Sequence, residues 1–132
     1  MQHKKPCLFC ELDGRAILGE TKHLFAIEDR YPVTPKHCLI IPKRHCSDFF
    51  ELEDFEYEEL FSFLKTQADR IRQEDSKVEA FNIGMNCGEA AGQTIFHCHV
   101  HLIPRRWGDI KDPKGGVRAV IADKKQYLIH PI

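Results

Sequence analysis

The stretch that decides the fold is residues 92–104, with the sequence GQTIFHCHVHLIP. His97, His99 and His101 occupy every second position, and Cys98, Val100 and Leu102 alternate with them. Successive side chains of a β-strand point to opposite faces, so this alternation predicts a strand with three imidazoles on one face, about 6.6 Å apart per step. Neutral imidazoles gain nothing from such a row and protonated ones repel each other. The row therefore indicates a metal site, a phosphate site or catalysis.

The segments around this stretch predict an α+β fold with a largely antiparallel sheet. Strands are expected over residues 23–28, 37–41, 78–86 and, as a short addition, 117–121, whereas residues 11–22 contain turn signals. Residues 54–73 predict the one clear helix, because apolar residues recur there at three- and four-residue steps: Tyr57, Leu60, Phe61, Leu64, Ala68 and Ile71. A chain of 132 residues can bury one core, so we expect a single domain over residues 1–132.

Composition and charge argue against several classes of function. Lys and Arg total 19 against 20 Asp and Glu, and this net charge of −1 argues against general nucleic-acid binding or membrane-surface binding. No apolar run approaches the roughly 20 residues that span a bilayer, and the N-terminus has no apolar secretory core. We therefore expect a cytoplasmic protein with no membrane or nucleic-acid partner. Six cysteines could form three disulfides, but a reducing compartment favours free thiols.

Cys7 and Cys10 form a C-x-x-C pair near the start of the chain. Such a pair is typical of half a zinc site or of a redox dithiol, and it also arises by chance. The βαβ context that a redox dithiol needs is not visible around it. The zinc hypothesis therefore depends on nitrogen ligands from elsewhere, and His45, at the exit of a predicted strand, occupies a suitable boundary position.

Other residues near the histidine stretch have simpler interpretations. Basic residues gather after it, and they predict either a solvated face or an attraction for anionic substrates: Arg105, Arg106, Lys111, Lys114 and Arg118. Trp107 could stack on a base, although ordinary packing is the favoured interpretation. Cys98 is expected on the strand face opposite the histidines and is excluded from the site.

Taken together, these residues resemble the histidine-triad (HIT) family of nucleotide hydrolases and transferases. The family signature His-φ-His-φ-His-φ-φ matches residues 97–103, and its usual lead-in matches residues 92–94. The proline-histidine landmarks match at PKH (35–37) and IPKRH (41–45). Residues 109–121 are similar, more loosely, to a tail of prokaryotic diadenosine-tetraphosphate-hydrolase-like members. The resemblance implies a HIT-like sheet of about five strands with one long helix and a shorter one, and a homodimer joined edge to edge.

The resemblance also implies a role for each matching residue. One structural zinc per chain would be held by Cys7, Cys10, His45 and His97. The implied catalytic residues are the nucleophile His99, the phosphate-contacting His101 and the supporting His37. His99 and His101 are also implied to contact the substrate. The other implied substrate contacts are the apolar base walls Leu8, Phe9 and Ile27, the ribose ligand Asp29, and the hydrogen-bonding residues Asn86, Gln93 and Thr94.

These roles imply an enzyme that hydrolyses nucleotidyl phosphoanhydride or phosphoramidate bonds, in dinucleoside polyphosphates or AMP-amine substrates. The reaction would pass through a nucleotidyl-histidine and release a nucleoside monophosphate, which suits a side chain that is partly neutral near pH 7 and leaves readily. No phosphate-binding glycine loop or carboxylate pair for two-metal catalysis is evident. Two alternatives stay open: one catalytic zinc held by all three histidines, and a non-catalytic module that binds purine nucleotides or a partner.

Overall fold

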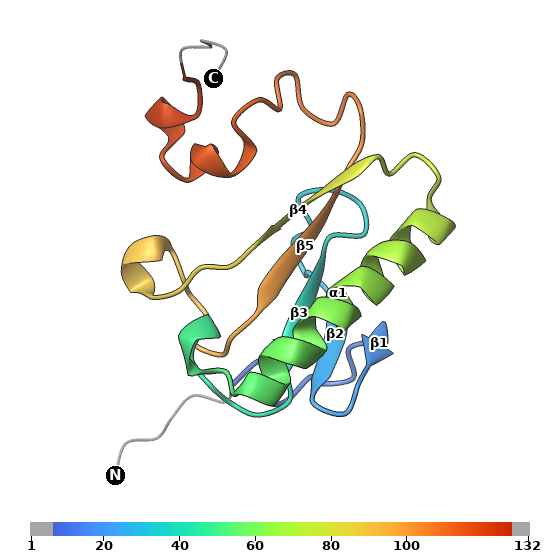
Figure 1. Cartoon of the computed structure of the whole chain (residues 1–132), viewed down its shortest axis with the longest axis vertical. Coiled ribbons are helices and arrows are strands. Elements are labelled where there is room, and N and C mark those ends of the chain that lie inside the picture. Colours follow the sequence, from blue (N-terminus) through green and yellow to red (C-terminus); the bar gives the residue numbers. More distant parts are fainter. Residues whose placement is uncertain (1–6, 128–132) are drawn as a thin grey trace.

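A five-stranded antiparallel sheet with one long helix across one face forms the framework of the computed structural model, which describes residues 7–127 (Figure 1). The strand order is β1-β2-β3-β5-β4, with β1 (Gly19–Glu20), β2 (Leu24–Glu28), β3 (Cys38–Pro42), β4 (Ala80–Gly84) and β5 (Val100–Arg105). The helices are α1 (Asp54–Glu74) and the 3₁₀ helices η1 (Phe49–Glu51), η2 (Glu89–Ala91), η3 (Gly116–Val120) and η4 (Ala122–Lys124). The predicted α+β fold is confirmed, and within residues 7–127 only 3₁₀ turns accompany α1.

The alternation along the strands divides the core into two layers. Alternate residues of β2, β3 and β5 pack against α1 in one apolar cluster that includes Leu24, Ile40 and Val100. The residues between them face the other side, where Phe25, Ile27, Leu39 and Ile41 pack with Phe9 from the N-terminal segment. Leu39 of β3 is paired with His101 of β5. His101 therefore lies on the face away from α1, beside the N-terminal segment.

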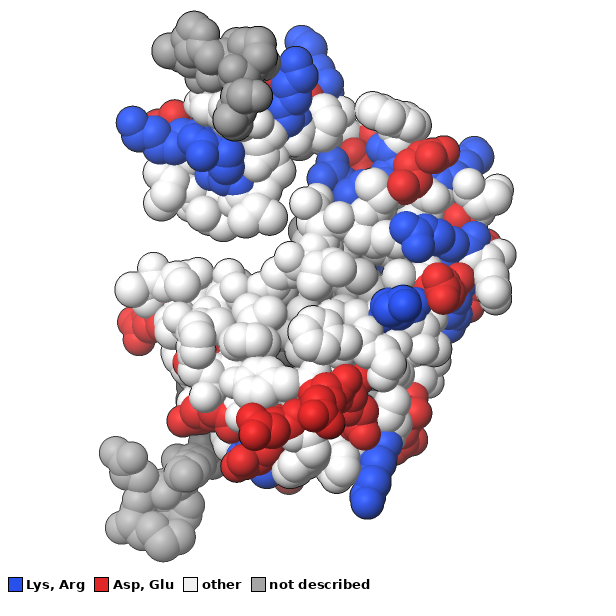
Figure 2. Space-filling view, in the orientation of Figure 1, with Lys and Arg blue, Asp and Glu red and all other residues white. Residues whose placement is uncertain are grey.

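The buried face of α1 shares Leu60 and Ile71 with the predicted stripe but also includes Phe63, which the pattern omitted. The buried positions are Glu56, Leu60, Phe63, Gln67 and Ile71, whereas Phe61 is 75% exposed. Periodicity counted only apolar residues, so it could not see that Glu56 and Gln67 complete this face. In Figure 2, acidic side chains gather over the first part of α1 and basic ones lie mainly over its far end and the C-terminal segment, as the helix dipole favours.

Glu56 joins the start of α1 to the loop after β3. Its carboxylate is 1% exposed and accepts hydrogen bonds from the backbone N–H of Glu53 at 2.8 Å and from Arg44 Nη2 at 2.7 Å. We expect Glu56→Ala to lower the free energy of unfolding by about 2 kcal/mol, because it removes the cap and the buried acceptor of Arg44. Urea denaturation followed by circular dichroism measures this loss. The exposed Glu58→Ala is the matched control, and equal losses in both variants would contradict the assigned role.

Outside the central region, one predicted strand is wrong and one short strand was missed. Residues 117–121 contain η3 where a strand was expected, with Val117, Val120 and Ile121 all more than 60% exposed. Gly115 and Gly116 both have positive φ, which favours a turn at this point. β1 was missed because its two residues lie within turn signals, yet they pair with β2. No α-helix in residues 7–127 combines the length and apolar character needed to cross a bilayer.

Candidate active site and metal centre

The histidine stretch lies at the entrance to β5. The strand itself begins at Val100, later than the sequence predicts, so His97 and His99 belong to the loop leading into it. This loop starts at Gly92, whose φ of 93° is a left-handed conformation that glycine adopts without strain. The alternation nevertheless persists, because Phe9 packs edge-on against both His97 and His99 while Cys98 is buried on the other side.

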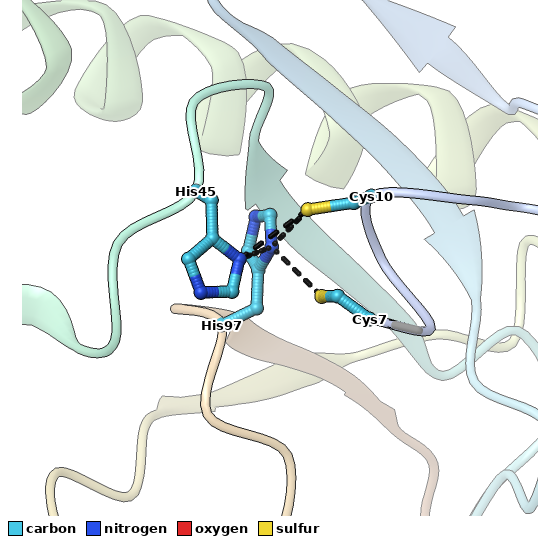
Figure 3. Close-up of side chains that lie close together, drawn as sticks. All are labelled: Cys7, Cys10, His45 and His97. Carbon is cyan, nitrogen blue, oxygen red and sulfur yellow. Dashed lines mark hydrogen bonds between the residues drawn. The ribbon is translucent and has the colours of Figure 1, made fainter. Parts of the chain in front are cut away.

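Four side chains from three distant segments converge on one point: Cys7, Cys10, His45 and His97 (Figure 3). His97 Nδ1 lies 3.1 Å from His45 Nδ1 and 3.3 Å from Cys7 Sγ. Cys10 Sγ lies 3.3 Å from His45 Nδ1 and 3.5 Å from His97 Nδ1. A tetrahedral zinc with bonds of about 2.0–2.3 Å separates its ligand atoms by about 3.3–3.8 Å. The four predicted ligands are therefore brought together in a geometry that fits such an ion.

A backbone hydrogen bond on the side of the ring away from the thiols fixes the orientation of His97. Its Nε2–H donates to the carbonyl oxygen of Pro42 at 2.8 Å, which leaves Nδ1 without a proton and directed at the thiols. Burial lowers the pKa of His97, against the opposing effect of this hydrogen bond, so the imidazole stays neutral as a metal ligand must. A hydrogen bond of this kind is what metal-ligating histidines ordinarily have.

A single zinc held by all three triad histidines does not fit this geometry. Within residues 7–127, His97 groups with the two cysteines, His101 groups with Asp29 and His37, and His99 belongs to neither set of potential ligands. The rings therefore serve separate environments, and the alternative with one open catalytic zinc is dismissed.

His99 is held so that one ring nitrogen is available. Its Nδ1–H donates to the backbone carbonyl of His97 at 2.8 Å, which is an acceptor that the sequence alone could not identify. The proton is thereby placed on Nδ1, and the lone pair remains on Nε2. His99 is half-buried and lines a cavity of about 380 Å³. An imidazole with a fixed tautomer beside a cavity is equipped to act as a nucleophile.

His37 and His101 form a hydrogen-bonded pair whose tautomers follow from the backbone. The N–H of Val33 donates to His37 Nδ1 at 3.1 Å, so the proton of neutral His37 is on Nε2. That Nε2–H donates to His101 Nδ1 at 2.9 Å, which places the proton of His101 on its own Nε2. Burial lowers the pKa of both rings, and burial with the neighbouring histidines lowers that of His101 to about 4. His101 is therefore a neutral N–H donor at the cavity.

The same tautomers exclude a second metal beside Asp29. The carboxylate Oδ2 lies 3.5 Å from His37 Nε2 and 3.9 Å from His101 Nδ1, distances that alone would suit an ion. A metal on His37 Nε2 would move that ring's proton to Nδ1, where the Val33 N–H already points. The group is consequently a hydrogen-bonded cluster. Asp29 keeps its other oxygen, Oδ1, as the acceptor of the Tyr31 N–H at 2.8 Å.

Most of the predicted nucleotide contacts share one cavity. The predicted residues that line it are Leu8, Phe9, Asp29, Asn86, Thr94, His99 and His101. Six lining residues were missed by sequence reasoning: Arg15, Arg30, Tyr31, Leu39, Gly92 and Ile95. Arg30 and Tyr31 directly follow Asp29, so their position in the chain could have indicated them. Arg15 carries no such signal, since only the folded N-terminal segment brings it to the cavity.

Two predicted contacts lie outside the lining of this cavity. Ile27 is 1% exposed and packs behind Phe9 and Leu39, because its position in β2 directs it into the core layer. Gln93 is 3% exposed, and its amide is fully engaged within the protein. Its Nε2 donates to the carbonyls of Ser47 and Ile95, and its Oε1 accepts from the N–H of Gly88. Gln93 thus fixes the loop before the histidines.

The structure also shows where the other residues considered near the histidine stretch lie. Arg105 pairs with Asp109 and Arg106 pairs with Asp75, so these two cations are already neutralised within the protein. Trp107 is 84% exposed and lines a different hollow, beside β4, so its ring is neither packed in a core nor placed at the His99 cavity. Burial raises the pKa of Cys98 to about 12, which suits a thiol that only packs. All six cysteines are free.

Comparisons with known proteins agree with this arrangement. A HIT domain model matches residues 13–108. A crystal structure of a HIT family protein from Bacillus anthracis superimposes with a TM-score of 0.72 at 40% identity, covering 78% of this chain and 75% of that one. A Zn-bound histidine triad family protein from Mycobacterium smegmatis gives a TM-score of 0.72 at 29% identity, covering 88% and 91%. An AP-4-A phosphorylase from Mycobacterium tuberculosis is 35% identical over 94 residues, which are 70% of this chain but only 48% of that protein.

Proposed function

The chain belongs to the HIT domain family, and from that premise we propose that it is a hydrolase acting on nucleotidyl phosphoanhydride or phosphoramidate bonds. Its substrates would be dinucleoside polyphosphates or AMP-amine compounds, and its product a nucleoside monophosphate. The observation that carries the proposal is the hydrogen bond from His99 Nδ1 to the carbonyl of His97, which leaves a nucleophilic nitrogen in the cavity. Incubation with diadenosine tetraphosphate and with an adenosine phosphoramidate, followed by chromatography for AMP, tests it directly.

In the proposed reaction, His99 Nε2 attacks the α-phosphorus and the bond from phosphorus to the leaving oxygen or nitrogen breaks. The leaving group departs with the bonding electron pair and takes a proton from solvent, and a nucleotidyl-His99 remains. Water then attacks this phosphorus and loses a proton to solvent, the bond from phosphorus to Nε2 breaks with its electron pair returning to Nε2, and the nucleoside monophosphate is released. Nδ1–H stays on the His97 carbonyl throughout, so it spreads the positive charge that develops on the ring.

The remaining residues would bind and orient the nucleotide. The His37 relay leaves the proton of His101 on Nε2, which would donate to a phosphate oxygen or the leaving atom, while Asp29 would accept the ribose hydroxyls. Asn86 and Thr94 would hydrogen-bond the phosphate, and Leu8 and Phe9 would cover the base. Phosphoryl transfer depends mainly on such positioning and charge stabilisation, so the proposed reaction requires no catalytic metal.

His37 is expected to act by holding the proton on the correct nitrogen of His101. His37→Leu should lower kcat by roughly 100-fold with little change in KM, because the donor to the phosphate loses its fixed orientation. His37→Gln places an amide N–H near the position of Nε2 and should restore much of the rate. Steady-state kinetics on both variants measures the difference. If Gln and Leu were equally slow despite equal thermal stability, the relay would be refuted.

Zinc is the metal we propose for the Cys7–Cys10–His45–His97 cluster. The two thiols and two imidazoles form a closed Cys₂His₂ donor set, and a related zinc-bound structure belongs to the same family. When bound, zinc would supply structural cross-linking and no chemistry on the substrate. It would tie the N-terminal segment, with Leu8 and Phe9, to the loop that carries His99.

A homodimer in the cytoplasm completes the proposal. β4 lies at the edge of the sheet and pairs only with β5 among the strands of residues 7–127. Its free edge could pair with the same edge of a second copy, which would extend the sheet and protect unpaired backbone groups. Six unpaired cysteines fit a reducing compartment.

A further inference from the structure

The cavity beside His99 has a cationic end that the proposed mechanism does not use. Arg15 and Arg30 line it together with Asp29, and the same three residues line a neighbouring hollow of about 340 Å³. The two hollows therefore share three lining residues, two of them arginines and one an aspartate. Tyr31, 81% exposed, also contributes to the lining of the His99 cavity.

Both guanidinium groups retain unused donors. In residues 7–127, no carboxylate lies within salt-bridge distance of Arg15 or Arg30, since the oxygens of Asp29 face Tyr31, His37 and His101. Arg15 is anchored at one end, because its Nη2 donates to the carbonyl of Glu28. Arg30 is exposed and has no protein acceptor within the same residues. These donors are available to a ligand in the cavity.

The covalent order of a nucleotide places its base near these donors. With the α-phosphate at His99 and the ribose hydroxyls at Asp29, the base is the group that extends beyond the ribose. Arg30 directly follows Asp29 in the chain, so its guanidinium is within a side-chain length of the ribose position. Leu8, 51% exposed at the same cavity, offers an apolar surface for the face of the ring. The guanidinium groups would then hydrogen-bond the edge of the base.

Guanidinium donates hydrogen bonds and accepts none, and this fixes the base edge that it can bind. Guanine and hypoxanthine present two adjacent acceptors, O6 and N7, whereas adenine presents the N6 amino donor in place of O6. We propose that Arg30, supported by Arg15, makes this cavity selective for 6-oxopurine nucleotides, those of guanosine and inosine, over adenosine nucleotides. The inference rests on the proposed function, because it assumes a nucleotide bound with its phosphate at His99.

Binding and turnover of three matched nucleotides test this selectivity. Calorimetric titration of the full-length, zinc-loaded protein with GMP, IMP and AMP gives the affinities, and the corresponding 5′-phosphoramidates give kcat/KM. We expect GMP and IMP to bind alike and about tenfold more tightly than AMP, the discrimination expected of one bidentate arginine contact. Tighter or equal binding of AMP would overturn the proposal. A preference for GMP over both IMP and AMP would also overturn it, since only the 2-amino group separates guanine from hypoxanthine.

Variants at residue 30 separate base recognition from simple charge. Arg30→Ala should weaken GMP and IMP binding about tenfold and leave AMP nearly unchanged. Arg30→Lys keeps the charge but lacks the planar pair of donors, so it should lose most of the preference as well. Lys65→Ala, an exposed cation on α1, is the control and should alter none of the three affinities. If Arg30→Ala weakened all three nucleotides equally, the residue would act through charge alone and the inference would be wrong.

The two readouts also separate this inference from the proposed function. Retained GMP and IMP preference with no turnover of any phosphoramidate or of diadenosine tetraphosphate would refute hydrolysis and support the assigned base selectivity. Turnover of all three phosphoramidates at equal kcat/KM would support hydrolysis and overturn the selectivity.

Discussion

Replacing His99 with alanine should abolish nucleotidyl transfer in a protein that still folds and still binds one zinc per chain. The variant removes the proposed nucleophile, and losses of about 1,000-fold or more in kcat are the scale for such a deletion. Zinc should be retained because His99 is outside the group formed by Cys7, Cys10, His45 and His97. Metal content by atomic emission, together with AMP release from an adenosine phosphoramidate, measures both halves of this expectation.

The covalent intermediate gives a sharper readout than the rate. A quench at alkaline pH, followed by mass spectrometry, should find the adenylyl group on the peptide containing residues 97–101 in the wild type and nowhere in His99→Ala. His101→Ala is the informative companion, because it leaves the nucleophile and should slow labelling without preventing it. Labelling on another residue, or turnover that survives in His99→Ala, would disprove the assigned nucleophile. Stoichiometric loss of zinc in that variant would revive a metal-centred mechanism.

The sequence predicted the framework well because its strongest signals are periodic. Residues 54–73 repeat at helical spacing, and α1 was found at Asp54–Glu74; the strands around Ile27 and Ile40 were bounded by turn residues and appear as β2 and β3. The signal fails where one face contains polar residues that the fold buries. Glu56 and Gln67 determine the inner face of α1, so a count of apolar residues wrongly included Phe61.

The candidate site was predictable where chemistry requires a particular side chain. The convergence of Cys7, Cys10, His45 and His97 was implied by a family resemblance, since only thiolates and imidazoles in such a pattern suit zinc. Residues with interchangeable roles were harder to place. Gln93 has the right groups for a phosphate contact, but its donors and acceptor are satisfied by backbone atoms that the sequence cannot position.

Backbone acceptors and donors were also invisible in the sequence. The His97 carbonyl sets the tautomer of His99, and the Val33 N–H sets that of His37 and, through it, His101. Any residue type could have supplied those backbone groups. Their effect follows only from the path of the chain, which explains why the sequence located the histidines but not the state of their protons.

Removing one thiolate of the metal cluster is the second change with a large expected effect. Cys10→Ser should abolish tight zinc binding, because a hydroxyl is a much poorer zinc ligand than a thiolate. At free zinc 100 times its Kd, the ion stabilises the wild type by about 2.7 kcal/mol, which corresponds to a loss of about 10 °C in Tm for the variant. Calorimetry with and without added zinc measures this difference. Cys87→Ser, at a partly buried thiol outside the cluster, is the control and should respond to zinc like the wild type.

The loss of zinc should also lower the reaction rate, because His97 connects the metal cluster to His99. His97 offers its ring to the cluster and its backbone carbonyl to His99 Nδ1, so the proposed zinc site and the proposed nucleophile are both held by this one residue. We expect Cys10→Ser to lower kcat by about 10- to 100-fold, the usual cost of disturbing the support of a site, and thus far less than His99→Ala. The wild type stripped with a chelator should show the same fall and regain its rate when zinc is restored, whereas Cys10→Ser should not. A variant without zinc that kept the full wild-type rate would separate the two functions of His97 and confine the metal to stability.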